Sequence, residues 1–595
     1  MADAAGRAER PATRVPERWD VEADVVVIGF GAAGACAALA AAELGCDVVV
    51  LDRFCGGGAT ALSGGVVYAG GGTAQQQAAG VSDSVDAMFR YLSQEVGDAV
   101  SPATLRAFCE GSAGMLTWLE GHGVPFDASL CPDKTSYPTN RHYLYYSGSE
   151  LSARDTAPPA PRGHRTHGPG TSGYLLFERL ARAVASSGAR VLPQTTAQRL
   201  VTDQAGRVAG AECSSLRGAP RWVRLAHRVL HRACAKPFLY VPKAGRVMHR
   251  PVAWLERRYS RPLLVAARGG VVLAAGGFVA NRPMLREHAP GARGGLPLGT
   301  PGDDGSGITL GVAAGGATAH LGRVSVWRFL TPPPALVHGV LVDREGRRVC
   351  DESRYGAAIG AAVVGEHAGG AWLLIDQATL DEARRQVRGT TLWFQRLQAW
   401  YLLSFGRVSA PTLAGVAARA GVDAAGLAAT LDAYNAAAAA GRPDPAGKPG
   451  ELVRLLASPP YSLLDCSVRP RLANPAPVLT LGGLVVDEQT GQVRQADGSQ
   501  IAGLYAAGRT AVGICSNSYV SGLSLADCVF SGRRAGQHAA ASREPKGRSA
   551  AWTDERPPRA EGRGAVWTEE REASAASAGA TREDSASKAP GGERD

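Results

Sequence analysis

Residues 24–52, DVVVIGFGAAGACAALAAAELGCDVVVLD, decide the fold of this chain. The run DVVVIG at 24–29 is apolar and β-branched, which predicts a strand buried on both faces. The Ala- and Leu-rich stretch 33–44 predicts a helix, and DVVVL at 47–51 predicts a second buried strand. A strand, a helix and a strand within about 30 residues form a βαβ unit.

Three glycines, Gly29, Gly31 and Gly34, join the first strand to the helix in the spacing G-x-G-x-x-G. The first permits a tight turn, the second lets the backbone approach a pyrophosphate, and the third allows close helix–strand packing. The helix N-terminus then presents free N–H groups to the phosphates. Asp52 follows at the end of the second strand, about 20 residues on, where a carboxylate can accept from ribose hydroxyls. The sequence therefore predicts a dinucleotide, FAD or NAD, on a Rossmann-type α/β fold.

The rest of the chain divides by its composition. Its 595 residues exceed one hydrophobic core, and 45% hydrophobic with 20% charged residues is typical of globular proteins. Both ends lack apolar periodicity and are predicted to be disordered tails. A mixture of helix-like and strand-like segments before the last strand predicts an α+β catalytic, or capping, domain inserted into the first. The predicted parts are a tail at 1–20, an FAD-binding domain at 21–285, the inserted domain at 286–475, the rest of the FAD-binding domain at 476–540 and a tail at 541–595.

Several other classes of protein are disfavoured by the sequence. The 11 cysteines include no C-x-x-C pair, and the 12 histidines show no metal spacing, so no disulfide framework or metal site is expected. Residues 1–20 lack the apolar region of a signal peptide, and there is no apolar run of about 18 residues. We therefore expect a cytoplasmic protein without a transmembrane helix. Nothing resembles a nucleic-acid-binding module, so no nucleic-acid partner is expected.

The positive charge is concentrated in residues 217–261, where 12 Lys and Arg residues face a single acid, Glu256. This segment interrupts a strand-to-strand connection and mixes cations with aromatic and aliphatic residues. Its arginines at 221, 224, 228 and 232 are spaced to share one helical face. Two interpretations remain open: a solvated surface excursion, or a peripheral docking surface for an anionic membrane.

Four further segments, taken in order, resemble the flavoprotein family of fumarate reductases, succinate dehydrogenases and ketosteroid dehydrogenases. They are GGGATALSGG at 56–65, VVLAAGGFVAN at 271–281, TPGDDGSG at 300–307 and LYAAGRT at 504–510. The resemblance covers roughly residues 21–540, apart from the basic insertion. It implies FAD as the cofactor, on a Rossmann-type FAD-binding domain that carries the inserted capping domain.

The resemblance also implies which residues contact FAD. In that family the C-terminal helix directs its N-terminus at the flavin pyrimidine ring, and Ser524 is the expected N-cap here. Family analogy places Ala197 against the adenine. The predicted cofactor contacts are Gly29, Gly31, Ala32, Ala33, Gly34, Asp52, Arg53, Thr60, Ser63, Gly64, Gly65, Ala197, Gly276, Gly508, Gly522, Leu523, Ser524 and Leu525.

The substrate side is indicated by the segment SYVSG at 518–522, just before the last predicted helix. Fumarate reductases carry an arginine at the position of Tyr519, and a phenol cannot clamp a carboxylate as a guanidinium does. Ketosteroid dehydrogenases carry the tyrosine, and their 1-ene-forming branch follows it with Pro and Gly. Val520 and Ser521 stand here instead, which resembles the 4-ene-forming branch. We therefore expect a steroid substrate, a 3-oxo-5α-steroid oxidised to its 4-ene.

Such a reaction needs a donor to the 3-keto oxygen, an acceptor for the C4 proton, and flavin N5 for the C5 hydride. Tyr519, with a backbone N–H such as that of Gly522, is expected to polarise the ketone. Ser521 is expected to take the proton, and Tyr355 to complete a relay, because a serine is a poor base unaided. The electron acceptor is not indicated by the sequence. The alternatives are 1-ene formation, enone or fumarate-type reduction, and a non-catalytic flavin-carrying electron-transfer subunit.

The sequence leaves two interpretations open for the aromatic segment 134–150 and two for a pair of histidines. The aromatic segment 134–150 (KTSYPTNRHYLYYSGSE), with tyrosines at 143, 145 and 146, either lines an apolar steroid pocket or packs under a loop. His164 and His167 are either structural or near the flavin. Cys515 lies near the predicted site, but no base accompanies it, so it is interpreted as a small buried residue.

Overall fold

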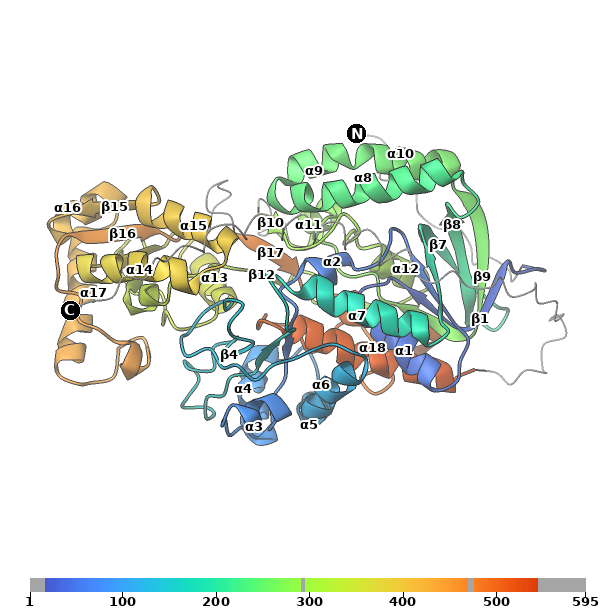
Figure 1. The fold of residues 1–595 in the computed structure, drawn as a ribbon, viewed down its shortest axis with the longest axis horizontal. Helices are drawn as coiled ribbons and strands as arrows, with labels where there is room; N and C mark the ends of the chain where they lie inside the picture. The colour runs from blue at the N-terminus through green and yellow to red at the C-terminus, as the bar shows by residue number, and fades with distance from the viewer. Residues whose placement is uncertain (1–15, 291–294, 469–475, 544–595) are drawn as a thin grey trace, which may run out of the picture. The chain divides into compact units, whose positions relative to one another are not determined.

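A computed structural model describes residues 16–290, 295–468 and 476–543, and its central feature is an eight-stranded sheet (Figure 1). The order β19-β20-β9-β1-β2-β6 forms its main path, and β8 joins through β9 and carries β7. The neighbours β20, β9, β1, β2 and β6 are parallel to one another. The strands are β1 (Val21–Ile28), β2 (Val48–Asp52), β6 (Arg190–Pro193), β7 (Thr195–Thr202), β8 (Val208–Ser215), β9 (Arg261–Leu273), β19 (Gln492–Arg494) and β20 (Gln500–Ala506).

The predicted βαβ unit is present, and helix α1 (Ala32–Glu43) joins its two strands. Ile28 pairs in register with Leu51 on one side and with Leu273 on the other. The carboxyl ends of three strands therefore meet at one edge of the sheet, which is where open α/β folds bind ligands. Strand β9 begins at Arg261, and its first half pairs antiparallel with β8.

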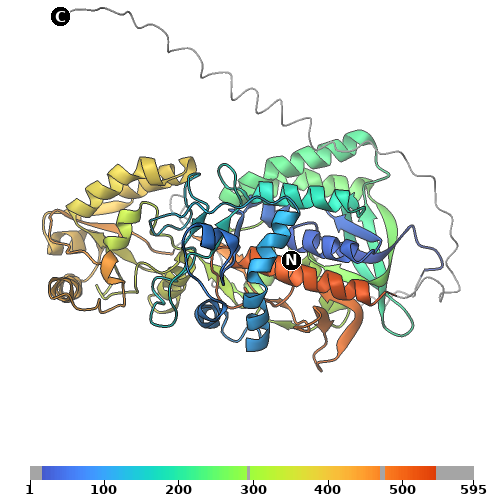
Figure 2. The same cartoon turned by 60° about the horizontal axis from the view of Figure 1, so that its bottom comes forward.

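The last helix, α18 (Leu523–Ala541), lies beside α1, as both views show (Figure 2). Two glycines permit this contact, because a Cβ on Gly532 would lie 2.5 Å from the oxygen of Ala33, and one on Gly536 would lie 2.2 Å from that of Ala37. Helix α7 (Gly173–Ser186) also packs on α1. Close packing of α18 on α1 brings a C-terminal segment to the cofactor edge of the sheet.

Smaller elements complete the FAD-binding part. A three-stranded sheet, β3-β5-β4, lies next to the start of α18. It consists of β3 (Val66–Tyr68), β5 (Gly163–Arg165) and β4 (Leu144–Tyr145). Other helices along residues 58–313 are α2 (Gly58–Leu62), α3 (Ala74–Ala78), α4 (Val85–Val96), α5 (Pro102–Glu110), α6 (Ser112–Gly121), α11 (Arg282–His288) and α12 (Ser306–Ala313). Helix α12 packs against β7 and β9 of the large sheet, although it lies within the predicted inserted domain.

A separate four-stranded antiparallel sheet, β13-β14-β16-β15, lies within the predicted inserted domain. It has its own hydrophobic clusters, which include Leu373 and Leu374 of β14. The boundaries 286 and 475 stay a prediction. Its elements are β13 (Val340–Val342), β14 (Trp372–Ile375), β15 (Arg407–Ala410), β16 (Tyr461–Asp465), α13 (Gly356–Gly365), α14 (Gln377–Thr390), α15 (Trp393–Ser404), α16 (Leu413–Ala420) and α17 (Ala424–Ala439).

Short strands link the two regions. β17 (Pro477–Thr480) lies between β10 (Leu296–Pro297) and β12 (Val324–Val326), and β11 (Thr318–Ala319) pairs with β18 (Gly483–Leu484). Of the predicted tails, 1–15 and 544–595 lie outside the described residues. Asp20, the last residue of the predicted tail 1–20, donates its N–H to the oxygen of Leu264 at 3.0 Å and accepts from the Leu264 N–H at 2.8 Å, and the boundary itself stays a prediction.

The basic insertion forms three helices between β8 and β9, at the top of Figure 1: α8 (Arg221–Tyr240), α9 (Pro242–Met248) and α10 (Arg250–Tyr259). Helices α8 and α9 approach closely at Gly245, where a Cβ would lie 2.3 Å from the backbone of Phe238. A small cluster that contains Val223 and Leu255 joins α8 to α10. The segment is therefore a folded unit with its own contacts.

The α1–α18 contact predicts a large stability difference between two glycine-to-alanine changes. Gly536→Ala forces a methyl group into the backbone of α1 and should lower the free energy of unfolding by about 3 kcal/mol. Gly114→Ala, in α6, meets nothing within 4 Å and should raise it by about 0.5–1 kcal/mol. Chemical denaturation of the FAD-loaded protein measures both. Equal stability of the two variants would contradict the packing argument.

Candidate active site

The glycine triplet leaves one position open toward the cofactor edge. Gly29 has φ +106°, and a Cβ there would lie 2.4 Å from the oxygen of Ala274. A Cβ on Gly34 would lie 1.9 Å from the oxygen of Gly29. A Cβ on Gly31 would meet nothing nearer than the Thr60 Oγ1 at 3.4 Å. The fold itself requires the first and third glycines, whereas the second leaves room for a bound group in front of the helix N-terminus, as a pyrophosphate needs.

The loop after β2 is shaped by glycines and hydroxyls. Gly56, Gly57 and Gly58 all have positive φ, a conformation that L side chains rarely adopt. The Thr60 hydroxyl accepts from the N–H of Ala32, the first residue of α1, at 3.0 Å. The Ser63 hydroxyl accepts from Gly65 N at 3.1 Å. These small residues hold the loop close to the N-terminus of α1.

The N-cap of α18 is Gly522, which corrects the expectation that Ser524 caps this helix. Gly522 has φ +89°, and a Cβ there would lie 2.8 Å from the N atom of Tyr68. Serine cannot occupy this position without strain. Ser524 lies instead in the first helical turn. Neither α1 nor α18 receives a hydrogen bond from the side chain of its N-cap residue, which leaves backbone N–H donors available at both ends.

Arg509, which the sequence analysis missed, supplies a further donor beside the glycine turn after β9. Its Nη2 donates to Asp303 Oδ1 at 2.6 Å, while its Nη1 is buried without a partner in the described residues. Gly276 lies next to this pair, and its N–H donates to Thr510 Oγ1 at 3.0 Å. The orphaned guanidinium nitrogen and the two helix N-termini fit an anionic dinucleotide such as FAD.

The remaining predicted cofactor contacts lie around the same sheet edge, and their roles stay predictions. Asp52 accepts from the backbone N–H groups of Phe30, Phe54 and Gly56 at 2.8–3.0 Å. Arg53 places its guanidinium on Glu256 and Asp304. The others are Ala33 in α1, Gly64 after α2, Ala197 in β7, Gly508 after β20, and Leu523 and Leu525 in the first turn of α18.

The basic insertion packs directly on the loop after β2. The ring of Phe54 stacks on that of His231, with centroids 3.6 Å apart and planes within 6°. His227 Nε2 lies 3.2 Å from Glu256 Oε1, and the same carboxylate holds Arg53 at 2.9 Å. Although burial alone raises it, hydrogen bonds from His227 and Arg53 lower the pKa of Glu256 to about 2. Glu256, the only acid of residues 217–261, therefore links the insertion to Arg53 in the loop after β2.

The predicted catalytic residues come together from parts of the chain that are far apart in sequence. Tyr355, at the start of α13, stacks on Tyr519 with ring centroids 6.3 Å apart. Trp327 packs on Tyr519 with centroids 4.7 Å apart. The Ser521 hydroxyl lies 3.2 Å from the hydroxyl of Tyr145, and either oxygen can be the donor. Tyr145 was expected only to line a pocket or pack under a loop, and its contact with Ser521 was missed.

The hydroxyl groups of this cluster are held in their protonated forms. Burial raises the pKa of Tyr519 well above its usual range. Burial and the neighbouring Tyr519 raise the pKa of Tyr355, against the opposing hydrogen bond from Ser521. Burial likewise raises the pKa of Tyr145. Each phenol therefore stays neutral near pH 7 and remains a hydrogen-bond donor.

A half-buried carboxyl group positions the segment before α18. Glu95 accepts from the hydroxyls of Ser518 at 2.8 Å and Tyr91 at 3.0 Å, and its backbone oxygen accepts from Asn517 Nδ2 at 3.0 Å. The Ser147 hydroxyl donates to the backbone oxygen of Ser521 at 3.0 Å. These contacts fix the backbone on both sides of Tyr519.

Other side chains named from the sequence have structural surroundings. His164 is buried, and its ring nitrogens lie 2.9 Å from Thr73 Oγ1 and 3.1 Å from the oxygen of Arg162. Burial lowers its pKa to about 4. His167 packs on the ring of Tyr143. Cys515 is buried, and burial raises its pKa. Of the tyrosines at 143, 145 and 146, Tyr145 is the one whose hydroxyl lies within hydrogen-bond distance of Ser521 Oγ.

Comparisons with known proteins agree with this geometry. Residues 24–524 match the family model described as an FAD binding domain. A 3-oxo-5-alpha-steroid 4-dehydrogenase of Comamonas testosteroni is 37% identical over 82% of this chain and 93% of its own length. A 3-oxosteroid 1-dehydrogenase of Mycobacterium tuberculosis is 28% identical over 84% and 94%. The crystal structure of 3-ketosteroid-delta4-(5alpha)-dehydrogenase from Rhodococcus jostii RHA1, in complex with 4-androstene-3,17-dione, has a TM-score of 0.75 at 33% identity and covers 89% of this chain and 100% of that one.

The stack of His231 on Phe54 predicts a pH effect. Burial and the neighbouring His249 and His227 lower the pKa of His231 to about 3, below its usual value near 6.5. The unfolded chain therefore binds a proton that the folded chain does not as the pH falls from about 6.5 to about 3, and stability is lost across that window. His231→Phe keeps an aromatic ring on Phe54 and should make the melting temperature less dependent on pH there.

His231→Ala is the matched control. It removes the same titrating group and the ring, so it should flatten the pH dependence equally but lower the melting temperature at pH 7. Parallel curves for the wild type and His231→Phe between pH 6.5 and 3 would contradict the assignment.

Proposed function

This chain belongs to the FAD-binding flavoprotein family that includes 3-oxosteroid dehydrogenases and fumarate reductases, and on that premise we propose that it oxidises 3-oxo-5α-steroids to 3-oxo-4-ene steroids. It is an FAD-dependent oxidoreductase, so the expected cofactor, fold class and family are confirmed. Identity is higher to the 4-dehydrogenase, at 37%, than to the 1-dehydrogenase, at 28%, which supports 4-ene formation. The observation that carries the proposal is the contact of Ser521 with two buried phenols, beside Tyr519.

Tyr519 is the proposed donor to the substrate ketone. Its phenol is protonated near pH 7, and the packing of Trp327 and Tyr355 on its ring restricts its orientation. A fixed donor is most effective where negative charge develops on an oxygen in the transition state. Hydrogen bonding to the 3-keto oxygen would acidify the neighbouring C4–H bond.

Ser521 is the proposed acceptor of the C4 proton. Its hydroxyl lies within hydrogen-bond distance of the Tyr145 phenol, and a hydrogen bond also links it to the Tyr355 phenol. Ser521 can therefore pass its own proton to one of these phenols as it receives the proton from C4. The glycine turns and the N-termini of α1 and α18 would hold FAD, which would supply the acceptor for the hydride that leaves C5. The residues of the chain therefore orient the ketone and move the proton.

Reduction of a dicarboxylate is not supported by this arrangement. The position that would carry a substrate-binding arginine is Tyr519. The positive charge of Arg509 lowers the pKa of Tyr519, against the larger effect of burial, but its guanidinium is paired with Asp303 at 2.6 Å. The side chains packed around Tyr519 are aromatic: Trp327 contacts its ring, and Phe329 packs on both Trp327 and Tyr355. These rings suit an apolar steroid better than a small dianion.

We further propose that helices α8–α10 form a peripheral contact surface for anionic membranes, where an apolar steroid would be dissolved. The support is the excess of cations in 217–261 together with exposed Trp222, Leu225 and Trp254. Aromatic and basic side chains on one surface are typical of interfacial membrane binding. None of the helices within 16–290, 295–468 and 476–543 is long and apolar enough to cross a bilayer.

The catalytic assignment predicts specific losses of turnover on a 5α-reduced 3-ketosteroid. Ser521→Ala should lower kcat by about 10²–10⁴-fold, because the C4 proton loses its acceptor. Tyr519→Phe keeps the ring but removes the ketone donor, and should cost about 10²–10³-fold. Flavin content and the position of the new double bond, found by mass spectrometry and NMR of the product, complete the measurement. Ser499→Ala, in the turn between β19 and β20, is the control and should match the wild type. Near-normal turnover of Ser521→Ala would remove the assignment.

The membrane proposal predicts co-flotation of the FAD-loaded protein with vesicles that contain phosphatidylglycerol, and little with pure phosphatidylcholine. High salt should release the protein, since the attraction is between charges. If the protein stays at the bottom of the gradient with anionic vesicles at low salt, the surface does not bind membranes.

A further inference from the structure

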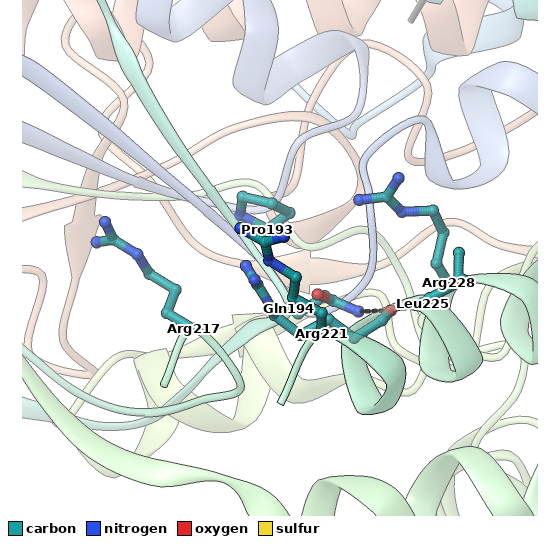
Figure 3. A pocket seen from close by; sticks show the side chains of 7 residues that line it. Pro193, Gln194, Arg217, Arg221, Leu225 and Arg228 are labelled. Carbon is teal, nitrogen blue, oxygen red and sulfur yellow. Dashed lines mark hydrogen bonds between the residues drawn. The ribbon is translucent and has the colours of Figure 1, made fainter. Parts of the chain in front are cut away.

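Four arginines line a cavity at the junction of β6 and α8. The cavity has a volume of about 280 Å³, and Figure 3 shows its lining, with Arg217 and Arg228 on opposite sides of Gln194 and Arg221. Its lining residues are Pro193, Gln194, Arg217, Arg221, Arg224, Leu225 and Arg228, none of which is acidic. Arg221, Arg224 and Arg228 follow the spacing i, i+3, i+7 and therefore share one face of α8.

These arginines have no carboxylate to balance their charge. In the described parts of the chain, no Asp or Glu oxygen lies within 4.0 Å of Arg217, Arg221, Arg224 or Arg228. The Nε atoms of Arg224 and Arg228 are buried and have no hydrogen-bond partner there. Glu256, the single acid of the insertion, is already shared by Arg53 and His227. Converging like charges repel one another, so an anion in the cavity would be strongly favoured.

We propose that this cavity binds the phosphate of an anionic phospholipid. The proposal rests on the membrane-contact surface assigned to α8–α10 above, and it names the group in the membrane that this surface recognises. Guanidinium groups bind phosphate oxygens with paired, charge-assisted hydrogen bonds, which makes arginine the side chain best suited to this task.

The surroundings of the cavity favour a lipid over free phosphate. Trp222, Leu225 and Val229 form an exposed apolar stripe next to the arginines on α8, with exposed fractions of 57%, 58% and 55%. Leu225 itself lines the cavity. Trp222 and Trp254 both pack edge-on against Tyr259, which places two exposed indoles together. A free anion makes no contact with this apolar stripe, whereas the glycerol and acyl chains of a lipid can pack against it.

The cavity lies beside the predicted ribose contact Asp52, which pairs in register with Pro193, but it contains none of the donors assigned to the FAD pyrophosphate. No residue that lines it belongs to the predicted cofactor contacts. The pyrophosphate donors lie at the glycine turn and the N-terminus of α1, whereas the arginines come from α8 and the turn before it. The flavin content of the variants tests this separation directly.

The experiment compares two double variants of the FAD-loaded protein that lose the same charge. Arg217→Ala/Arg221→Ala removes two cavity arginines, and Lys243→Ala/Arg257→Ala removes two exposed cations of α9 and α10. Flotation with vesicles of phosphatidylcholine and phosphatidylglycerol gives the membrane affinity. We expect the cavity variant to lose at least tenfold more affinity than the control, with its flavin content and its turnover on a soluble steroid unchanged.

A second arm uses calorimetry with dihexanoyl phosphatidylglycerol, which is water-soluble, and with inorganic phosphate. The wild type should bind the short-chain lipid at one site and at least tenfold more tightly than phosphate, and the cavity variant should not bind it. Equal affinity for phosphate would overturn the assignment to a lipid. If the two double variants lose equal membrane affinity, the cavity is not the lipid-binding site, although the membrane-contact surface is still supported. If the wild type does not float with anionic vesicles, both the membrane-contact surface and the lipid site are contradicted. If the cavity variant loses its flavin, the arginines belong to the FAD site and the lipid proposal is contradicted.

Discussion

The active-site geometry depends on the left-handed backbone of Gly522. The chain passes there from the segment that carries Tyr519 and Ser521 into α18, and a side chain at this position would meet the backbone of Tyr68. The oxygen of Gly522 accepts from the N–H of that same residue at 3.1 Å, which ties the turn to β3. Because the N-cap is a glycine, no side chain covers the N–H groups at the start of α18. One residue therefore sets the direction of the proposed catalytic pair and leaves a positive helix end beside it.

Local signals in the sequence were sufficient to predict the Rossmann-type scaffold. The period and composition of residues 24–52 determine a strand, a turn and a helix without help from the rest of the chain. The expectation that Tyr519, Ser521 and Tyr355 act together came from the family resemblance, and in the structure Tyr355 stacks on Tyr519 and is hydrogen-bonded with Ser521. The N-cap was misplaced at Ser524 because serine is the commoner capping residue. Only the close approach of β3, which is a tertiary contact, requires glycine at that position.

The contacts that the sequence analysis missed join residues that are distant along the chain. Tyr145 and Ser521 are 376 positions apart, and Arg509 and Asp303 are 206 apart. No periodicity links such residues, because their meeting depends on how β4, β20 and the neighbouring loops pack. The basic insertion shows the same limit. Its excess of cations was visible in the sequence, but the use of its one acid to hold Arg53 and His227 was not. Because of that pairing, Glu256 does not balance the charge of Arg221, Arg224 or Arg228, and no other carboxylate among the described residues does so within 4.0 Å.

In the parts of the chain that the structure describes, the Ser521 hydroxyl is hydrogen-bonded to phenols and to no carboxylate or imidazole, which is compatible with the chemistry of the proposed step. Among the described residues, the hydroxyl partners of Ser521 are the phenols of Tyr145 and Tyr355, whose pKa values burial raises. A carboxylate in such an apolar, buried place would pay a large desolvation cost or become protonated. Hydroxyl groups can accept one proton while they donate another, so a chain of them moves a proton without placing a full charge on any member. The burial that makes the phenols weak acids therefore suits them to a relay, and the acidity needed at C4 must come from the hydrogen bond of Tyr519 to the ketone.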